Sequence, residues 1–116
     1  MLFKLLMPMF KAKSVKVDEM LNDGQVLPVL GGLQVVNTFG HTPGHISLYS
    51  PSTKILFGGD SMRSSGDRLM PSPLINTWDE AKMLEAIRFQ AALGAEIVCV
   101  GHGAVIKDAA SKFPQL

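Results

Sequence analysis

The sequence predicts a mixed α/β (α+β) fold, in which a mostly antiparallel or mixed β-sheet is flanked by helices. Short apolar runs separated by glycine-rich turns fill the first half, and a segment with helical apolar spacing precedes a last apolar run. Hydrophobic residues make up 47% of the 116 residues and charged residues 18%, which is typical of a domain with a buried core. We therefore expect one domain over residues 1–116.

The first half predicts two β-hairpins. Residues 25–30 and 33–39 are β-like runs joined by a diglycine, which reaches positive φ without a steric clash. Residues 46–50 and 54–57 form the next pair, with Pro-Ser-Thr at the tip of the turn. Both connections are short, so each pair of strands is expected to run antiparallel.

The second half predicts a loop, a helix, a strand and a last helix. Residues 61–77 are rich in Ser, Pro, Gly and Arg, so we expect an exposed loop. Residues 97–100 form a continuous apolar run, which predicts a strand covered on both faces. Residues 105–113 are expected to form a short helix.

The predicted central helix has recognisable start and stop signals. Thr77 is the expected N-cap, and Glu80 lies three residues on, at the spacing of a capping box. Gly94 is the expected stop. The apolar face at helical spacing consists of Ala81, Leu84, Ile87 and Ala91.

Charge and cysteine content exclude some classes of function. The 11 Lys and Arg residues nearly balance 10 Asp and Glu residues and form no basic run, which argues against nucleic-acid binding. The lone Cys99 cannot form an internal disulfide, which fits the reducing cytoplasm. The apolar segment 1–10 is interrupted by Lys4 and Pro8 and falls short of the ~20 residues of a membrane span. We expect this segment to pack against protein, and we expect the chain to have no membrane partner.

All three histidines stand close to glycine at expected strand ends. His41 and His45 belong to the segment Gly-His-Thr-Pro-Gly-His, His102 lies between two glycines, and Asp60 follows a diglycine. Each feature alone is usually a hydrogen-bonded surface histidine or a turn. Together, imidazole and carboxylate groups at strand ends suit zinc, and iron or manganese less specifically.

Three segments resemble motifs of the metallo-β-lactamase superfamily, and of its glyoxalase II-like branch in particular. Residues 38–49 resemble the T-P-G-H-T-x-G-H segment, residues 55–60 resemble the L-F-x-G-D strand end, and residues 98–106 resemble the P-G-H-G signature. The motifs occur in the family's order and spacing, and the resemblance covers about residues 17–106.

The resemblance implies a role for each matching residue. His41 corresponds to a ligand of the first metal, His102 to a ligand of the second, and Asp60 to the carboxylate that bridges them. His45 corresponds to a position that is not a ligand, so we expect its ring to be hydrogen-bonded near the site. Zinc is the implied metal, with iron or manganese as alternatives.

One family motif has no counterpart here. The H-x-H-x-D-H motif supplies most of the metal ligands, and this chain has no histidine before His41. The resemblance therefore implies the C-terminal half of a four-layer αββα sandwich, truncated, with the N-terminal half absent and the metal incompletely coordinated. The uncovered sheet would require either that missing half or a homo-oligomer, most simply a homodimer.

In the complete protein, the resemblance implies hydrolysis of an ester, thioester, amide or phosphoester by a metal-bound hydroxide. The chain alone is expected to be inactive. The alternative is a non-catalytic domain that acts in assembly or binding. A serine hydrolase is disfavoured, because Ser47 and Ser61 lack a Gly-x-Ser-x-Gly elbow.

Overall fold

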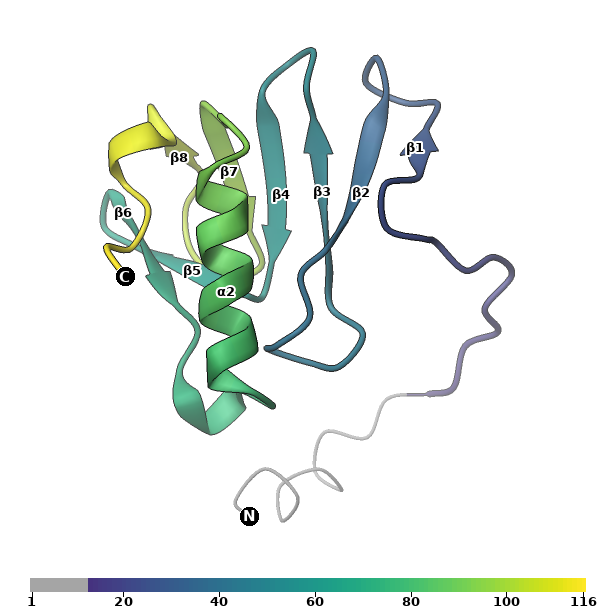
Figure 1. Cartoon of the computed structure of the whole chain (residues 1–116), viewed down its shortest axis with the longest axis horizontal. Helices are drawn as coiled ribbons and strands as arrows, with labels where there is room; N and C mark the ends of the chain where they lie inside the picture. Colours follow the sequence, from purple (N-terminus) through teal and green to yellow (C-terminus); the bar gives the residue numbers. More distant parts are fainter. Residues whose placement is uncertain (1–12) are drawn as a thin grey trace.

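The computed structural model describes residues 13–116 (Figure 1). The expectation that segment 1–10 packs against protein lies outside the described residues. The strands are β1 (Val26–Leu27), β2 (Leu33–Asn37), β3 (Ile46–Ser50), β4 (Ile55–Gly59), β5 (Met62–Ser65), β6 (Arg68–Pro71), β7 (Ile97–Val100) and β8 (Ile106–Lys107). The α-helix is α2 (Glu80–Ala91), and 3-10 turns occupy Leu74–Asn76 and Ala109–Ser111.

Six strands form one sheet in the order β1-β2-β3-β4-β7-β8, and β5 pairs with β6 in a separate hairpin. Strand β4 pairs parallel with β7, whereas the other neighbours in the sheet are antiparallel. The connection from β4 to β7 runs through the β5–β6 hairpin and α2, as a parallel pair requires a crossover. The predicted mixed sheet with a flanking helix is confirmed.

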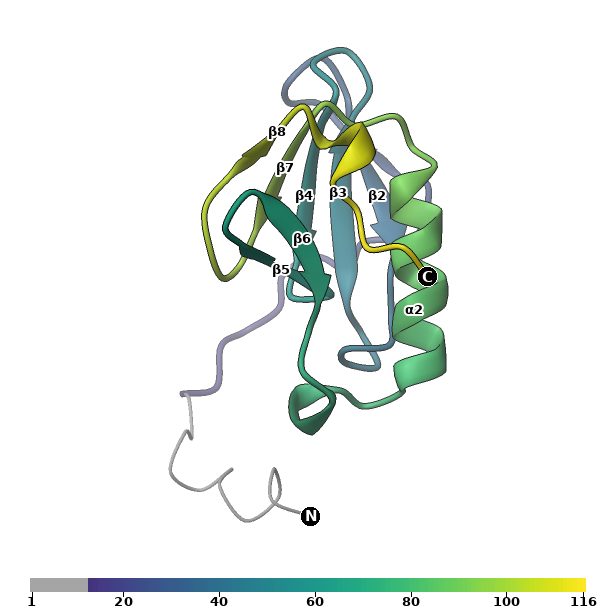
Figure 2. The same cartoon turned by 90° about the vertical axis from the view of Figure 1, so that its left-hand side faces the viewer.

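Helix α2 covers one face of the sheet and closes the core there (Figures 1 and 2). Residues paired across strands point to the same face, so Tyr49, Leu56 and Val98 lie in one row beneath the helix. Leu56 and Val98 are fully buried, and Met83 and Ile87 of α2 pack in the same cluster. We call this the covered face.

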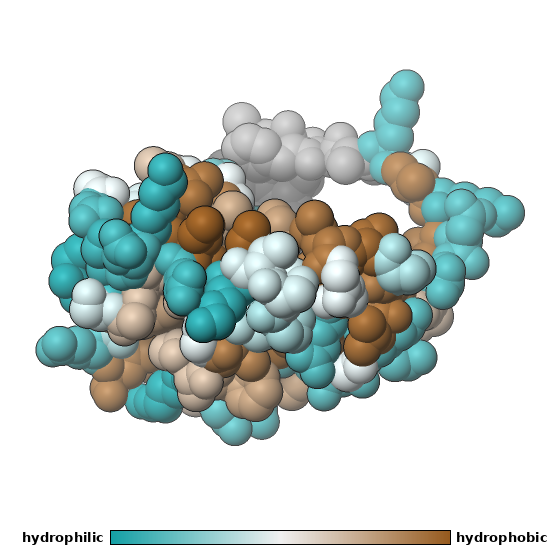
Figure 3. Space-filling model, turned by 90° about the horizontal axis from the view of Figure 1, so that it is seen from above, coloured by the Kyte–Doolittle hydropathy of each residue, from teal (hydrophilic) through white to brown (hydrophobic). Residues whose placement is uncertain are grey.

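The opposite face has no helix over it in residues 13–116 (Figures 1 and 2). The register places Leu48, Phe57 and Cys99 in one row there, and Ile55 and Ile97 in the next. All five are only partly buried, although four of them are large and apolar. Seen from above, apolar atoms reach the surface at several places between hydrophilic ones (Figure 3). We call this the open face.

The prediction of an exposed loop over residues 61–77 is wrong for residues 62–71. Residues 62–71 form the β5–β6 hairpin, with Arg68 opposite Ser65 across the tip. Met62 is 0% exposed and Leu69 is 1% exposed, so the hairpin contributes to the core. Two inward apolar side chains anchor a segment whose other residues are mostly polar.

The predicted helix exists, but its start and its buried face differ. Asp79, not Thr77, is the N-cap, and its carboxylate accepts a hydrogen bond from the Lys82 amide at 3.0 Å. Of the expected apolar face, Ile87 is buried and Leu84 packs against the core, whereas Ala81 and Ala91 are exposed. The buried side chains of α2 are Met83, Ala86, Ile87 and Gln90.

The prediction of a last helix over residues 105–113 is also wrong. Strand β8 pairs Ile106 with Val98, and a short 3-10 turn follows Asp108, which adopts the left-handed region at φ 50°.

Strand β7 has the predicted bounds, but its predicted burial on both faces is incomplete, because Ile97 on the open face is only partly buried. No helix in the described part of the chain is long and apolar enough to cross a membrane.

Candidate metal site

The loop between β2 and β3 carries His41 and rests against the start of α2. The amides of Trp78 and Asp79 donate hydrogen bonds to the carbonyls of His41 and Gly40, at 3.0 and 2.8 Å. Gly40 has φ 144°, and a Cβ there would overlap the backbone of Met83. Glycine at position 40 therefore lets the histidine loop approach the helix this closely.

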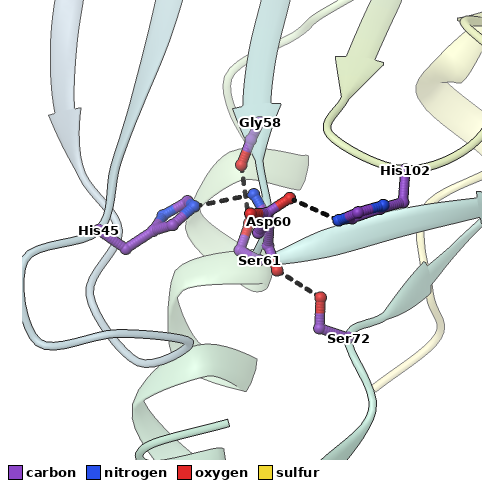
Figure 4. A network of polar contacts seen from close by, with 6 residues as sticks. All are labelled: His45, Gly58, Asp60, Ser61, Ser72 and His102. Carbon is purple, nitrogen blue, oxygen red and sulfur yellow. Dashed lines mark hydrogen bonds and ion pairs between the residues drawn. The ribbon is translucent and has the colours of Figure 1, made fainter. Parts of the chain in front are cut away.

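Asp60 lies in the tight turn that ends β4. Gly59 adopts φ 62°, and a Cβ at that position would collide with the His45 ring. The Asp60 amide donates a 2.9 Å hydrogen bond to Nε2 of His45. On the other side of the turn, the Ser72 hydroxyl donates to the Asp60 carbonyl (Figure 4). The backbone of Asp60 is thus fixed from two sides, which leaves its carboxylate free to face solvent.

His102 follows β7 in a loop that the β5–β6 hairpin supports. The Ser64 amide donates to the His102 carbonyl at 3.1 Å, and the Ser64 hydroxyl donates to the Ala104 carbonyl at 2.6 Å. The Gly101 amide donates to the Gly59 carbonyl at 2.9 Å, which joins the two strand ends. The hairpin that the sequence did not predict therefore positions one of the predicted ligands.

Asp60 and His102 meet where the neighbouring strands β4 and β7 end (Figure 4). Nε2 of His102 lies 3.6 Å from Oδ1 of Asp60, and their side chains are 81% and 44% exposed. A Cβ on Gly101 would overlap the Asp60 carboxylate, so the glycine keeps space open beside the pair. A contact this exposed contributes little to stability, so stability alone does not account for the geometry.

His45 lies between the two parts of the site. Its ring accepts a hydrogen bond at Nε2 from the Asp60 amide, so the proton is on Nδ1, which donates to the Thr38 hydroxyl at 2.8 Å. Burial lowers the pKa of His45 below its ordinary 6.5, and the neighbouring His41 lowers it further, whereas Asp60 and Thr38 act in the opposite direction. These contacts agree with the structural role expected for His45.

The structure brings two of the three predicted ligands into contact, and it places the third nearby. The rings of His41 and His45 lie edge to face with centroids 5.9 Å apart, and His45 contacts Asp60. Nδ1 of His41 is buried without a hydrogen-bond partner, which a metal ion would supply. The donor types fit a metal, yet within residues 13–116 no three His, Cys, Asp or Glu side chains form a group that could hold one.

Sequence reasoning missed the polar residues that support the site. Thr38, Ser47, Ser61 and Gln90 are at most 1% exposed and are hydrogen-bonded to one another. Gln90 follows Met83 and Ile87 at helical spacing, so a polar residue on the apolar face of α2 was the available signal. The burial of Ser47 and Ser61 also disfavours either as an exposed nucleophile.

Comparison with known proteins identifies relatives of this chain. The family model of the metallo-beta-lactamase superfamily matches residues 3–102. The lactamase-like protein nscB of Aspergillus fumigatus is 31% identical over 96 residues, 82% of this chain and 27% of that protein. A hydroxyacylglutathione hydrolase of Rhodobacter capsulatus is 37% identical over 89 residues, 74% of this chain and 32% of that protein. The chain thus spans roughly a third of the length of these relatives.

Solved structures agree with the sequence comparison. A metallo-beta-lactamase family protein from Thermus thermophilus, TTHA1429, superposes with a TM-score of 0.65 at 29% identity, over 79% of this chain and 31% of that chain. The protein TTHA1623, solved in a di-iron-bound form, superposes with a TM-score of 0.68 at 26% identity, over 90% of this chain and 52% of that chain. Fold, motifs and relatives coincide, and the chain therefore belongs to the metallo-beta-lactamase superfamily.

Proposed function

We propose that the complete protein is a metal-dependent hydrolase of esters, thioesters, amides or phosphoesters, and that this chain carries part of its metal site. The observation that carries the proposal is the Asp60–His102 pair, 3.6 Å apart at two adjacent strand ends. Two kinds of relative support hydrolysis of a thioester in particular: the hydroxyacylglutathione hydrolases, and an atrochrysone carboxyl ACP thioesterase that is 27% identical over 105 residues.

His41, Asp60 and His102 are the proposed ligands. Asp60 is central, because its carboxylate can bridge two metals while its backbone is held by His45 and Ser72. Imidazole and carboxylate donors suit zinc, and they also accept iron or manganese. A bound metal ion lowers the pKa of a water ligand to about 7 and polarises the substrate oxygen.

Residues 13–116 bring too few donors together for a complete catalytic site. A catalytic zinc ordinarily has three protein ligands and a water, and the described residues bring no such group together. We propose that further ligands come from another segment or another chain. The chain alone then binds zinc weakly and has no hydrolase activity.

The open face is the proposed contact for that missing partner. Leu48, Ile55, Phe57 and Ile97 lie side by side there and are only partly buried. Apolar sheets pack face to face at ~10 Å, so a second sheet fits this surface. For the isolated chain, we propose a two-fold homodimer, because the same face can then cover itself.

Zinc titration of the isolated chain tests the ligand assignment. We expect weak binding that dialysis removes, and its loss in the variants Asp60→Asn and His102→Ala. Asp67→Asn is the matched control, since Asp67 is a 75% exposed carboxylate in the turn of the β5–β6 hairpin. Equal binding in all variants would contradict the ligand assignment. A tightly held pair of zinc ions in one chain would contradict the proposal that further ligands come from elsewhere.

Fusion to an H-x-H-x-D-H segment tests the reaction. Joining such a segment, taken from a hydroxyacylglutathione hydrolase, should produce zinc-dependent hydrolysis of a thioester, and Asp60→Asn should abolish it. Zinc-dependent turnover by the unfused chain, lost in His41→Ala, would show that the site is already complete.

A second candidate is a non-catalytic domain that acts in assembly or binding. The observation that favours it is the absence of a three-donor group among residues 13–116. The same fusion separates the two candidates. A fusion that folds and covers the open face, yet neither retains zinc nor hydrolyses a thioester, supports the non-catalytic domain.

A further inference from the structure

Gln90 is a buried polar side chain on the covered face. It projects from α2 and is 0% exposed, one turn beyond the fully buried Ile87. A buried amide costs free energy unless its hydrogen bonds are made. Here they are made: Oε1 accepts from the Ser47 hydroxyl at 3.1 Å, and Nε2 donates to the Ser61 hydroxyl at 3.0 Å and to the Ala86 carbonyl at 3.2 Å.

The hydrogen bonds of this network have a defined direction. The Asp60 amide donates to His45 Nε2, so His45 Nδ1–H donates to the Thr38 hydroxyl. The Thr38 hydroxyl then donates to Ser47 at 2.9 Å, and the Ser47 hydroxyl donates to Gln90. The Ser47 hydroxyl also lies 3.2 Å from the Gly58 carbonyl, so Ser47 contacts both Gln90 and the strand end that precedes Asp60.

The other end of the network returns to the same turn. Gln90 donates to Ser61, and the Ser61 hydroxyl donates to the Gly58 carbonyl at 3.1 Å (Figure 4). The network therefore begins at the amide of Asp60 and ends on the residues that flank it in the chain. Buried networks of this kind fix one arrangement when all members are satisfied.

We propose that Gln90 is a positioning residue for Asp60, acting from α2 through Ser47 and Ser61 on the turn that presents the carboxylate. The importance of that carboxylate rests on the proposed function, in which Asp60 is a metal ligand. The turn is closely packed, because a Cβ at Gly59 would overlap the His45 ring and a Cβ at Gly101 would overlap the Asp60 carboxylate. A displacement of this turn would move the Asp60 carboxylate relative to His102.

The side-chain volume at position 90 can be kept while its hydrogen bonds are removed. Gln90→Met fills similar space, but it leaves Ser61 without its donor and Ser47 without its acceptor on α2. Ser61→Ala interrupts the network one step closer to Asp60. Ile87→Val is the control, because it loosens the core of the same helix without touching the network.

Hydrogen exchange at the Asp60 amide of the metal-free chain tests the proposal. Relative to the most protected amides of the sheet, we expect protection at Asp60 to fall about tenfold in Gln90→Met and in Ser61→Ala, as loss of buried hydrogen bonds implies. Ile87→Val should leave this ratio unchanged. Unchanged protection in both network variants, or an equal fall in Ile87→Val, would overturn the proposal.

Zinc titration of the same variants separates this proposal from the proposed function. Mutation of a residue that supports a metal ligand typically lowers metal affinity by about 10- to 100-fold, and for Gln90→Met we expect a decrease at the lower end of this range. If exchange at Asp60 accelerates while zinc binding is unchanged, the positioning role stands and the ligand role of Asp60 fails. If exchange is unchanged, the positioning role fails whatever the zinc affinity.

Discussion

The two faces of the six-stranded sheet are built from neighbouring residues, yet they differ in what surrounds them. Leu56 points to the covered face and is 0% exposed, whereas Leu48, on the adjacent strand, points to the open face and is partly buried. The covered face also contains the buried polar network around Asp60. One face is closed by α2 and carries the buried network, whereas the apolar side chains in the middle of the other are only partly buried, and we propose that this second face receives a partner.

The largest effect is expected from removing the same side chain on the two faces. Leu56→Ala should lower the free energy of unfolding by about 3 kcal/mol, because it leaves a cavity in a closed core. Leu48→Ala should cost less than about 1 kcal/mol in the monomer, where it loses only partial burial. Urea unfolding at low protein concentration measures both, and equal losses would contradict the distinction between the faces.

Self-association should depend on the open face alone. Phe57→Lys places a charge in the centre of that face, so we expect the dimer dissociation constant to rise by at least about 30-fold. Phe89→Lys is the matched control, because Phe89 is 56% exposed on α2. Light scattering at micromolar concentration decides: a wild-type mass of 12.5 kDa would reject the homodimer.

The strands that lead to the site were largely predictable from the sequence. Strand β3 has the predicted bounds, Ile46–Ser50, and β7 was predicted as Ile97–Val100, because both are compact β-like runs bounded by turn residues. The strand-end positions of Asp60 and His102 follow from β4 and β7, and the glycines beside them marked the close approach. Short-range patterns were sufficient wherever an element was defined by its own residues.

Elements defined by contacts distant in sequence were not predictable in this way. The β5–β6 hairpin depends on the burial of Met62 and Leu69 within a polar segment, and β8 forms because Ile106 pairs with Val98. The network around Asp60 joins α2 to three loops and strands, so its members are separated by up to 43 residues. Tertiary context overrode the local pattern in each case.

The helix that makes the covered face distinct should be sensitive to its cap. Asp79→Ala removes the acceptor for the Lys82 amide and should cost about 1 kcal/mol of unfolding free energy. Thr77→Ala should cost within about 0.5 kcal/mol, since Thr77 is not the N-cap. Thermal unfolding of both variants measures the difference, and a larger loss for Thr77→Ala would restore the start of the helix expected from the sequence.

The smallest expected effect is a pH dependence that belongs to the covered face. Burial and the neighbouring His41 lower the pKa of His45 in the folded chain, whereas the unfolded chain keeps a value near 6.5. As pH falls below 6.5, the unfolded state therefore takes up a proton that the folded state does not bind, so the free energy of unfolding decreases. Above pH 6.5 the ring is neutral in both states, and this contribution to the pH dependence vanishes. Urea unfolding of the metal-free chain between about pH 5 and 8 measures the slope, and His45→Gln should reduce it even if overall stability changes. A slope of the same size in His45→Gln would show that His45 is not the source of the effect, and that the polar network does not hold its ring in the neutral form.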